Sequence, residues 1–218
     1  NFEYEPDEVI NTGLPRWDVL KDKSQGKREI LIMPTWRNWL DSVPDKDFEE
    51  SDYFRHYMGL LNSERLNQIL EKYDLEVNFY LHAKFQEYAD TFKSISKRIH
   101  LISFGEVAVN EMLMRCRMLI TDYSSVCWDI LYQDKPSLFY QFDIEKYNEA
   151  HGSYIDMETE LFGDRAATQE QLLDYLEETV QNDFRLKPEY EKMRGEYLQF
   201  KDHEHSRHIC EEIKKRFH

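Results

Sequence analysis

The sequence predicts an α/β fold, a Rossmann-like parallel sheet with flanking helices, on three observations. Short apolar runs alternate with longer segments of helical periodicity between residues 28 and 142. The apolar runs are nearly continuous, which is typical of parallel strands covered on both faces. The segments between them can carry helices as right-handed crossovers, so the alternation indicates a doubly wound sheet.

The expected elements follow from these runs and their spacing. The predicted strands lie at 28–36, 76–82, 98–104, 117–122 and 135–142. Helical spacing marks 53–73, 106–116 and 125–133. Gly59 and the "NSE" at 62–64 predict that the first of these segments splits into two helices. The acidic stretch "DSVPDKDFEESD" at 41–52 is predicted to be an exposed loop.

Residues 168–218 change character and are predicted to add C-terminal helices to the sheet. Thr168 followed by Gln171 is the capping-box pattern that opens a helix. Pro188 begins a second helical segment, because proline is favoured in a first helical turn, and 203–217 forms a third. No internal repeat or low-complexity linker interrupts the sequence, so residues 1–218 are predicted to form one domain.

Composition excludes several classes of protein. Apolar residues make up 41% of the 218 residues, which is enough for a folded core. The formal charge of −15 argues against a nucleic-acid partner, because phosphate contacts need clustered Lys and Arg. No run of 18 apolar residues and no signal-peptide pattern occurs. Because the sequence lacks an initiator Met, we expect a fragment of a longer protein.

Three cysteines, Cys116, Cys127 and Cys210, lack C-x-x-C spacing, and we expect reduced thiols in a cytoplasmic protein. No metal or cofactor is predicted. The "DKD" at 45–47 resembles a metal-binding Asp-x-Asp, but no strand comes immediately before it. The histidines within 203–208 are dense, yet zinc would need further ligands, so a solvated helix is the favoured interpretation.

The segment "TDYSS" at 121–125 places hydroxyls and a carboxylate between a predicted strand and a predicted helix. Ligands of open α/β sheets bind outside the carboxyl ends of strands, and the first N–H groups of a helix attract anions. Ser124 and Ser125 are therefore candidates for phosphate binding, with Asp129 one turn further on to accept hydrogen bonds. The simpler interpretation, that Asp122 or Ser124 caps the helix, remains open on the sequence alone.

Four segments occur in this order along the chain: "TGLPRWDVL" (12–20), "ILIMPTWR" (30–37), "YLH" (80–82) and "ITDYSSVCWDILYQDKPSLFYQFDIEKY" (120–147). This set resembles the CDP-glycerol glycerophosphotransferase family, the teichoic-acid polymerases and primases of bacterial cell walls. The resemblance implies the C-terminal, donor-binding half of a two-domain GT-B-type transferase. The family's expected catalytic base, a histidine in a His-Gly segment of the N-terminal half, has no counterpart here, so the chain alone is expected to be inactive.

The resemblance also implies donor contacts. Arg16 would face the donor pyrophosphate, and Pro34 and Thr35 would reach the donor from the turn after a strand. His82 would hydrogen-bond or neutralise a phosphate and is the catalytic candidate of this chain. One departure is Tyr80, which stands where family members commonly carry arginine, and this change bears on donor choice.

Further donor contacts are implied at the polar segment. Ser124 and Ser125 would bind phosphate oxygens, and Asp129 would orient the remaining polar part of the donor. Arg37, in "TWRNW", is a weaker candidate for phosphate.

Taken without the resemblance, some of these residues have simpler interpretations. Arg16 could be a surface residue tied to Asp18, and His82 could be a structural residue at a strand end. Trp36 and Trp39 are expected to pack against the sheet.

The chemistry implied by the resemblance is transfer of glycerol phosphate from CDP-glycerol to a glycerol-phosphate polymer or lipid-linked acceptor, with release of CMP. Such phosphoryl transfer depends on positioning and on neutralising negative charge. The implied partners are the donor, the acceptor and the N-terminal half of the same protein, at the inner face of the cell membrane. Two alternatives stay open: a transferase that uses CDP-ribitol or another nucleotide-activated donor, and a non-catalytic nucleotide-binding domain.

Overall fold

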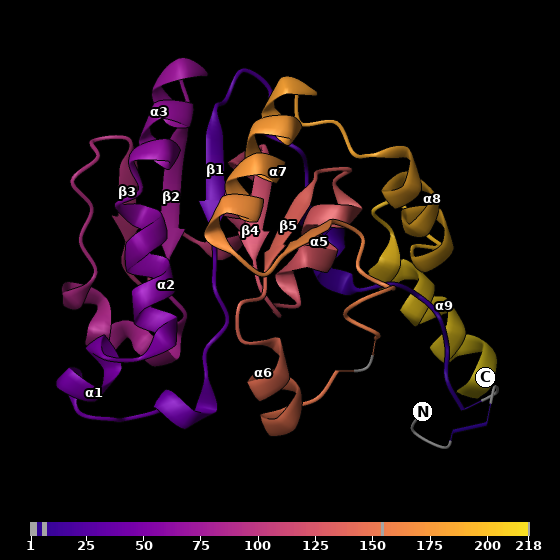
Figure 1. Ribbon diagram of the computed structural model, residues 1–218. Coiled ribbons are helices and arrows are strands. Elements are labelled where there is room, and N and C mark those ends of the chain that lie inside the picture. Colours follow the sequence, from indigo (N-terminus) through magenta and orange to yellow (C-terminus); the bar gives the residue numbers. More distant parts are fainter. Residues whose placement is uncertain (1–3, 6–7, 154, 218) are drawn as a thin grey trace.

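The computed structural model describes residues 4–5, 8–153 and 155–217, which form a six-stranded parallel sheet with helices on both faces (Figure 1). The strand order is β3-β2-β1-β4-β5-β6, and each neighbouring pair is parallel. The strands are β1 (Glu29–Ile32), β2 (Glu76–Tyr80), β3 (Ile99–Ile102), β4 (Met118–Thr121), β5 (Ser137–Tyr140) and β6 (Asp164–Ala166). The predicted α/β class is thereby confirmed.

Helices connect the strands and extend the C-terminal end of the domain. The α-helices are α1 (Asp45–Glu49), α2 (Asp52–Leu61), α3 (Glu64–Lys72), α4 (Val109–Arg115), α5 (Val126–Tyr132), α6 (Ile144–Ala150), α7 (Gln169–Gln181), α8 (Pro188–Tyr197) and α9 (His205–Phe217). Shorter 3-10 helices are η1 (Pro15–Val19), η2 (Asn38–Leu40) and η3 (Ala83–Thr91). Within the described residues, none of these helices combines the length and apolarity needed to span a bilayer.

Both faces of the sheet are buried, which explains why the strands are apolar without alternation. Ile30 and Ile32 of β1 pack into one cluster with α2, α3 and α7, which lie over the same face in Figure 1. Leu31, between them, points into a second cluster with α4 and α5. All three side chains are fully buried, and burial of each is worth about 1.5–3 kcal/mol.

The strand order creates a crevice between β1 and β4. The chain moves outward from β1 through β2 to β3, and then returns to place β4 on the other side of β1. The connections after β1 and β4 therefore leave the sheet in opposite directions, and ligands of open α/β sheets bind at such a point. Ile32 and Ile120 pair at this place, so the residues that follow them define the crevice.

Most predicted elements are confirmed. All five predicted strands are present, and the capping box of Thr168 and Gln171 opens α7. Pro188 occupies the first turn of α8, and the three cysteines are free thiols. The long helical segment splits within the predicted "NSE", at Ser63, whose hydroxyl accepts the Leu66 N–H of α3.

Some predictions are wrong or incomplete. Gly59 lies inside α2 and does not interrupt it. The predicted loop at 41–52 contains α1, whose residue Phe48 is fully buried and stacks on Tyr88 at 3.9 Å between ring centroids. Strand β6 and helix α6 were not predicted. The first is short and begins with two charged residues, and the second buries no side chain, so neither leaves an apolar pattern in the sequence.

Candidate functional site

The loops after three neighbouring strands place expected donor contacts at the carboxyl edge of the sheet. Pro34 and Thr35 follow β1, His82 follows β2, and Ser124 and Ser125 follow β4. Because the order is β2-β1-β4, these loops are adjacent at the crevice. The structure thus brings five of the expected donor contacts to one edge.

Asp122 organises this edge, and the sequence interpretation gave it only a capping role. Its fully buried carboxylate accepts the backbone N–H of Thr35 at 2.8 Å and of Tyr123 at 2.6 Å on one oxygen. The other oxygen accepts the Tyr57 hydroxyl at 3.1 Å and lies 2.9 Å from Arg37 Nη2. Asp122 therefore ties the loop after β1 to the loop after β4 and does not cap α5.

Arg37 is the cation of this network. Protein groups occupy its guanidinium, so the prediction that it is a candidate, though a weaker one, for binding phosphate is wrong. Its side chain is fully buried and binds Asp143 through Nε at 2.7 Å and through Nη2 at 3.0 Å. Nη1 donates to the Thr35 carbonyl at 2.7 Å. Burial alone would lower the pKa of Arg37, but Asp122 and Asp143 outweigh burial and raise this pKa well above its ordinary value.

The serines at the start of α5 are accessible to a ligand to different degrees. Ser125 is exposed and is the N-cap residue of α5, but its side chain makes no capping hydrogen bond. Ser124 is half-buried, and its hydroxyl makes a long contact of 3.5 Å with the Val126 N–H. The Thr35 hydroxyl is buried and has no hydrogen-bond partner among the described residues. The hydroxyls of Ser124 and Ser125 can therefore turn toward an anion.

Arg16 and Asp129 form an ion pair, so the alternative that tied Arg16 to Asp18 is wrong. Arg16 Nε lies 2.6 Å from Asp129, whose side chain is 5% exposed, whereas the Arg16 side chain is 52% exposed. The indole N–H of Trp17 donates to the same carboxylate at 2.8 Å. In this arrangement Asp129 orients Arg16 while the guanidinium keeps an open side. A direct contact between Asp129 and a donor stays a prediction.

His82 is both a structural residue and an available hydrogen-bond donor. Its Nδ1 accepts the backbone N–H of Lys84 at 3.2 Å, so His82 is the N-cap of η3. Burial lowers the pKa of His82, which favours the neutral ring. With Nδ1 accepting, the neutral ring carries its proton on Nε2. His82 can therefore donate one hydrogen bond to a phosphate oxygen.

Tyr80, which the resemblance marks as a departure from arginine, is 3% exposed and packs in the second core cluster.

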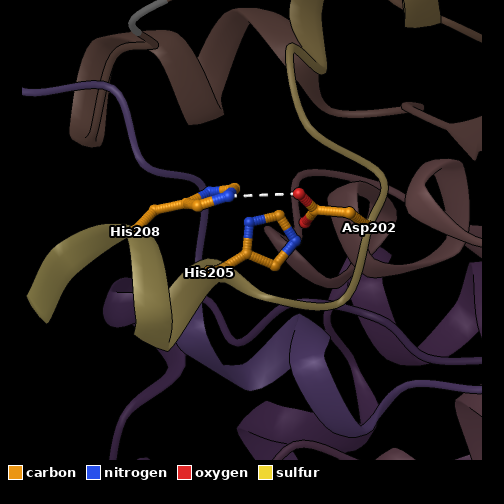
Figure 2. Close-up of side chains that lie close together, drawn as sticks. All are labelled: Asp202, His205 and His208. Atoms are coloured by element: carbon orange, nitrogen blue, oxygen red, sulfur yellow. Dashed lines mark ion pairs between the residues drawn. The ribbon is translucent and has the colours of Figure 1, made fainter. Parts of the chain in front are cut away.

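Asp202, His205 and His208 form the only cluster of potential metal ligands found in the described part of the chain (Figure 2). His208 Nε2 lies 3.1 Å from the Asp202 carboxylate. However, His205 Nδ1 bonds the Thr12 carbonyl at 3.0 Å, and Nε2 bonds the Tyr132 hydroxyl at 3.1 Å. Both nitrogens of this buried ring are engaged, so we assign the cluster to packing of α9.

The α9 helix is docked onto the segment that carries Arg16. The Asp18 carboxylate accepts the backbone N–H groups of His205 at 2.7 Å and of Ser206 at 3.0 Å. The His205 ring also lies against Gly13, where an added Cβ would approach Nδ1 to 2.1 Å. Residues 12–18 are thus held from outside by α9.

A parallel sheet with polar groups at the β1–β4 crevice defines an α/β domain suited to binding a phosphorylated ligand. The chain matches the CDP-Glycerol:Poly(glycerophosphate) glycerophosphotransferase family over residues 1–215, and it belongs to that family. The resemblance stated from the sequence is thereby confirmed.

Similar proteins agree with this family. The chain is 30% identical to the minor teichoic acid biosynthesis protein GgaB of Bacillus subtilis, over 93% of this chain and 23% of that protein. It is 26% identical to the teichoic acid glycerol-phosphate transferase of Staphylococcus aureus, over 98% of this chain and 56% of that protein. The chain therefore spans roughly a quarter to a half of the length of these two relatives.

Solved structures share the fold. A structure of the wall teichoic acid polymerase TagF aligns with a TM-score of 0.71 at 22% identity, over 98% of this chain and 53% of that chain. A UDP-N-acetylglucosamine 2-epimerase aligns with a TM-score of 0.53 at 18% identity, over 97% of this chain and 52% of that chain.

Arg37→Met should lower the free energy of unfolding by about 3–5 kcal/mol, because it leaves the buried carboxylates of Asp122 and Asp143 uncompensated. The matched control is Arg65→Ala, since Arg65 pairs with Glu170 and Asp174 on the exposed surface and should cost at most about 1 kcal/mol. Urea unfolding measures both. Equal losses for the two variants would contradict the structural role of Arg37.

Proposed function

We propose that this chain is the nucleotide-donor-binding domain of a transferase that moves glycerol phosphate from CDP-glycerol to a glycerol-phosphate polymer or lipid-linked acceptor. The observation that carries the proposal is the family match, which extends over residues 1–215. Two further facts support it: the relative from Staphylococcus aureus is a teichoic acid glycerol-phosphate transferase, and one of the similar TagF structures was obtained after a soak with CDPG.

The reaction would be an in-line displacement at the phosphorus that bears glycerol. An acceptor hydroxyl oxygen forms the new bond to phosphorus, the pyrophosphate bond breaks, and CMP leaves with the bonding electrons. Catalysis of this kind comes from positioning and from donors aimed at the developing charge. The Arg16 guanidinium, the His82 Nε2–H and the hydroxyls of Ser124 and Ser125 are suited to bind the donor phosphates.

The hydroxyl proton needs a base, and the described residues at the crevice offer no side chain suited to that role. His82 is unsuited to that role in its present geometry, because Nδ1 already accepts a hydrogen bond and Nε2 carries the proton. We propose that the base comes from a second domain of a longer protein, which would face this edge as in GT-B-type transferases. A lipid-linked acceptor would place the enzyme at the cytoplasmic face of the membrane.

A related donor is the second candidate. The teichoic acid ribitol-phosphate polymerase TarK of Staphylococcus aureus is 28% identical over 81% of this chain. Tyr80 stands where the resemblance implies an arginine, so this chain lacks that positive charge. CDP-ribitol would use the same phosphate contacts and differ only at the polyol.

Calorimetric titration of the chain with CDP-glycerol, CDP-ribitol, CMP and a UDP-sugar tests the proposal. We expect CDP-glycerol to bind most tightly, because it is the donor in the name of the family that matches this chain. Tighter binding of CDP-ribitol would reassign the donor. Failure of every nucleotide to bind would contradict a donor-binding domain.

Ser124→Ala combined with Ser125→Ala should weaken CDP-glycerol binding by about 10-fold to 100-fold, because two hydroxyl contacts to phosphate are lost. The control is Ser63→Ala, which removes the cap of α3 and should cost about 1 kcal/mol of stability without changing affinity. Unchanged affinity in a folded double variant would exclude the two hydroxyls from donor binding.

His82→Ala should weaken CDP-glycerol binding by about tenfold, because the Nε2–H donor is lost, whereas His82→Gln should retain part of the affinity. The Gln side-chain N–H can stand where the imidazole Nε2–H stands. Calorimetry of both variants, with circular dichroism to check folding, decides the outcome. Equal affinities of wild type and His82→Ala would remove His82 from the site.

A further inference from the structure

A cluster of aromatic rings and basic side chains lies beside the proposed donor contacts. Trp36 and Trp39, both half-buried, follow β1, and the ring of His151 lies 6.2 Å from each of them. Lys84 and Lys146 place their ammonium groups over the two indoles. We name this set the tryptophan platform: Trp36, Trp39, Lys84, Lys146 and His151.

The platform gathers positive charge in a chain whose formal charge is −15. Lys84 Nζ lies 5.7 Å from the centre of the Trp36 ring, and Lys146 Nζ lies 4.9 Å from that of Trp39. In the described part of the chain, Lys84 has one carboxylate within ion-pair distance, Asp41 at 3.8 Å, and Lys146 has none. Cation–π contact holds an ammonium over a ring while leaving its other N–H groups free for an anion.

Helix α6 presents Lys146 and leads directly into His151, although it buries no residue. Its N-cap residue, Asp143, forms an ion pair with Arg37. Tyr147, within the helix, stacks on Tyr123 with 3.6 Å between the ring centroids. In Figure 1, α6 lies beyond the carboxyl ends of β4 and β5. Most helices in proteins are stabilised by a buried apolar face. Helix α6 is instead attached to the polar network that shapes the crevice.

We infer that the tryptophan platform binds the acceptor, an extended polyol phosphodiester, next to the donor. Lys84 and Lys146 bind phosphodiester oxygens, and the indole faces pack against the polyol carbons. This assignment rests on the proposed function, because it supplies the second substrate of that reaction. The ring of His82 lies 6.5 Å from Trp36, so an acceptor on the platform meets the donor phosphate at His82. A chain of net charge −15 repels a polyanion, and a local group of cations offsets that repulsion.

A synthetic trimer of glycerol phosphate is the probe. The chain has four tryptophans, and their indole N–H resonances can be followed in the ¹⁵N-labelled protein during titration at low salt. We expect the signals of Trp36 and Trp39 to shift and the signal of Trp128 to stay in place, because Trp128 packs on Phe162 and Tyr197 instead.

The decisive variant is Lys84→Ala combined with Lys146→Ala. We expect trimer affinity to fall about tenfold or more and CDP-glycerol affinity to stay within about twofold, since alanine keeps the Lys84 N–H that orients His82. Lys192→Ala combined with Lys215→Ala is the control, because it changes net charge equally at exposed sites on α8 and α9.

Several results would overturn the inference. These are absence of trimer binding to the wild-type chain, equal losses in the two double variants, and a parallel loss of CDP-glycerol binding, which would place the platform in the donor site. Tighter binding of a uridine trinucleotide than of the trimer would assign the rings to base stacking. The two proposals fail separately: trimer binding without CDP-glycerol binding contradicts the donor proposal alone.

Discussion

The buried contact between Asp122 and Arg37 is the interaction on which the carboxyl edge of the sheet depends. Both side chains are fully buried, and together with Asp143 they join the loop after β1, the loop after β4 and the start of α6. A buried ion pair adds little folding stability compared with an apolar pair of the same shape, but removal of one partner lowers stability strongly, because the other charge stays buried without compensation. The arrangement is therefore more a device for fixing loop positions than a source of net stability.

The same contact holds the loops of the proposed anion site in place without a glycine-rich loop. The Asp122 carboxylate accepts the backbone N–H groups of Thr35 and Tyr123, so the two loops keep fixed directions. The Ser125 side chain is exposed on one of these loops, the Ser124 side chain is half-buried, and the Thr35 hydroxyl is buried. Groups that are held in place before a ligand arrives need no reorganisation when charge develops on phosphate, which is the basis of electrostatic catalysis.

The sequence predicted the sheet well and the polar network poorly, and the physical reason is the same in both cases. Strands buried on both faces leave continuous apolar runs in the sequence, and such runs mark β1 to β5. Helix α6 and strand β6 leave no such run, because α6 buries nothing and β6 begins with charged residues. Arg37 sits in "TWRNW" and was predicted to be a weaker candidate for phosphate, because its two carboxylate partners lie 85 and 106 positions away along the chain. The position of Asp129 one turn after Ser125 was predicted correctly, but its partner, Arg16, is 113 residues distant.

The docking of α9 onto residues 12–18 has a consequence for the order in which the site is assembled during synthesis. Asp18 and His205 are 187 positions apart, so the contact between them cannot form until the sheet and the start of α9 have been synthesised. Arg16, by contrast, is translated before any strand of the sheet. The segment that carries the cation proposed to face the donor is thus made before the sheet, and its contact with α9 forms only after the sheet is complete.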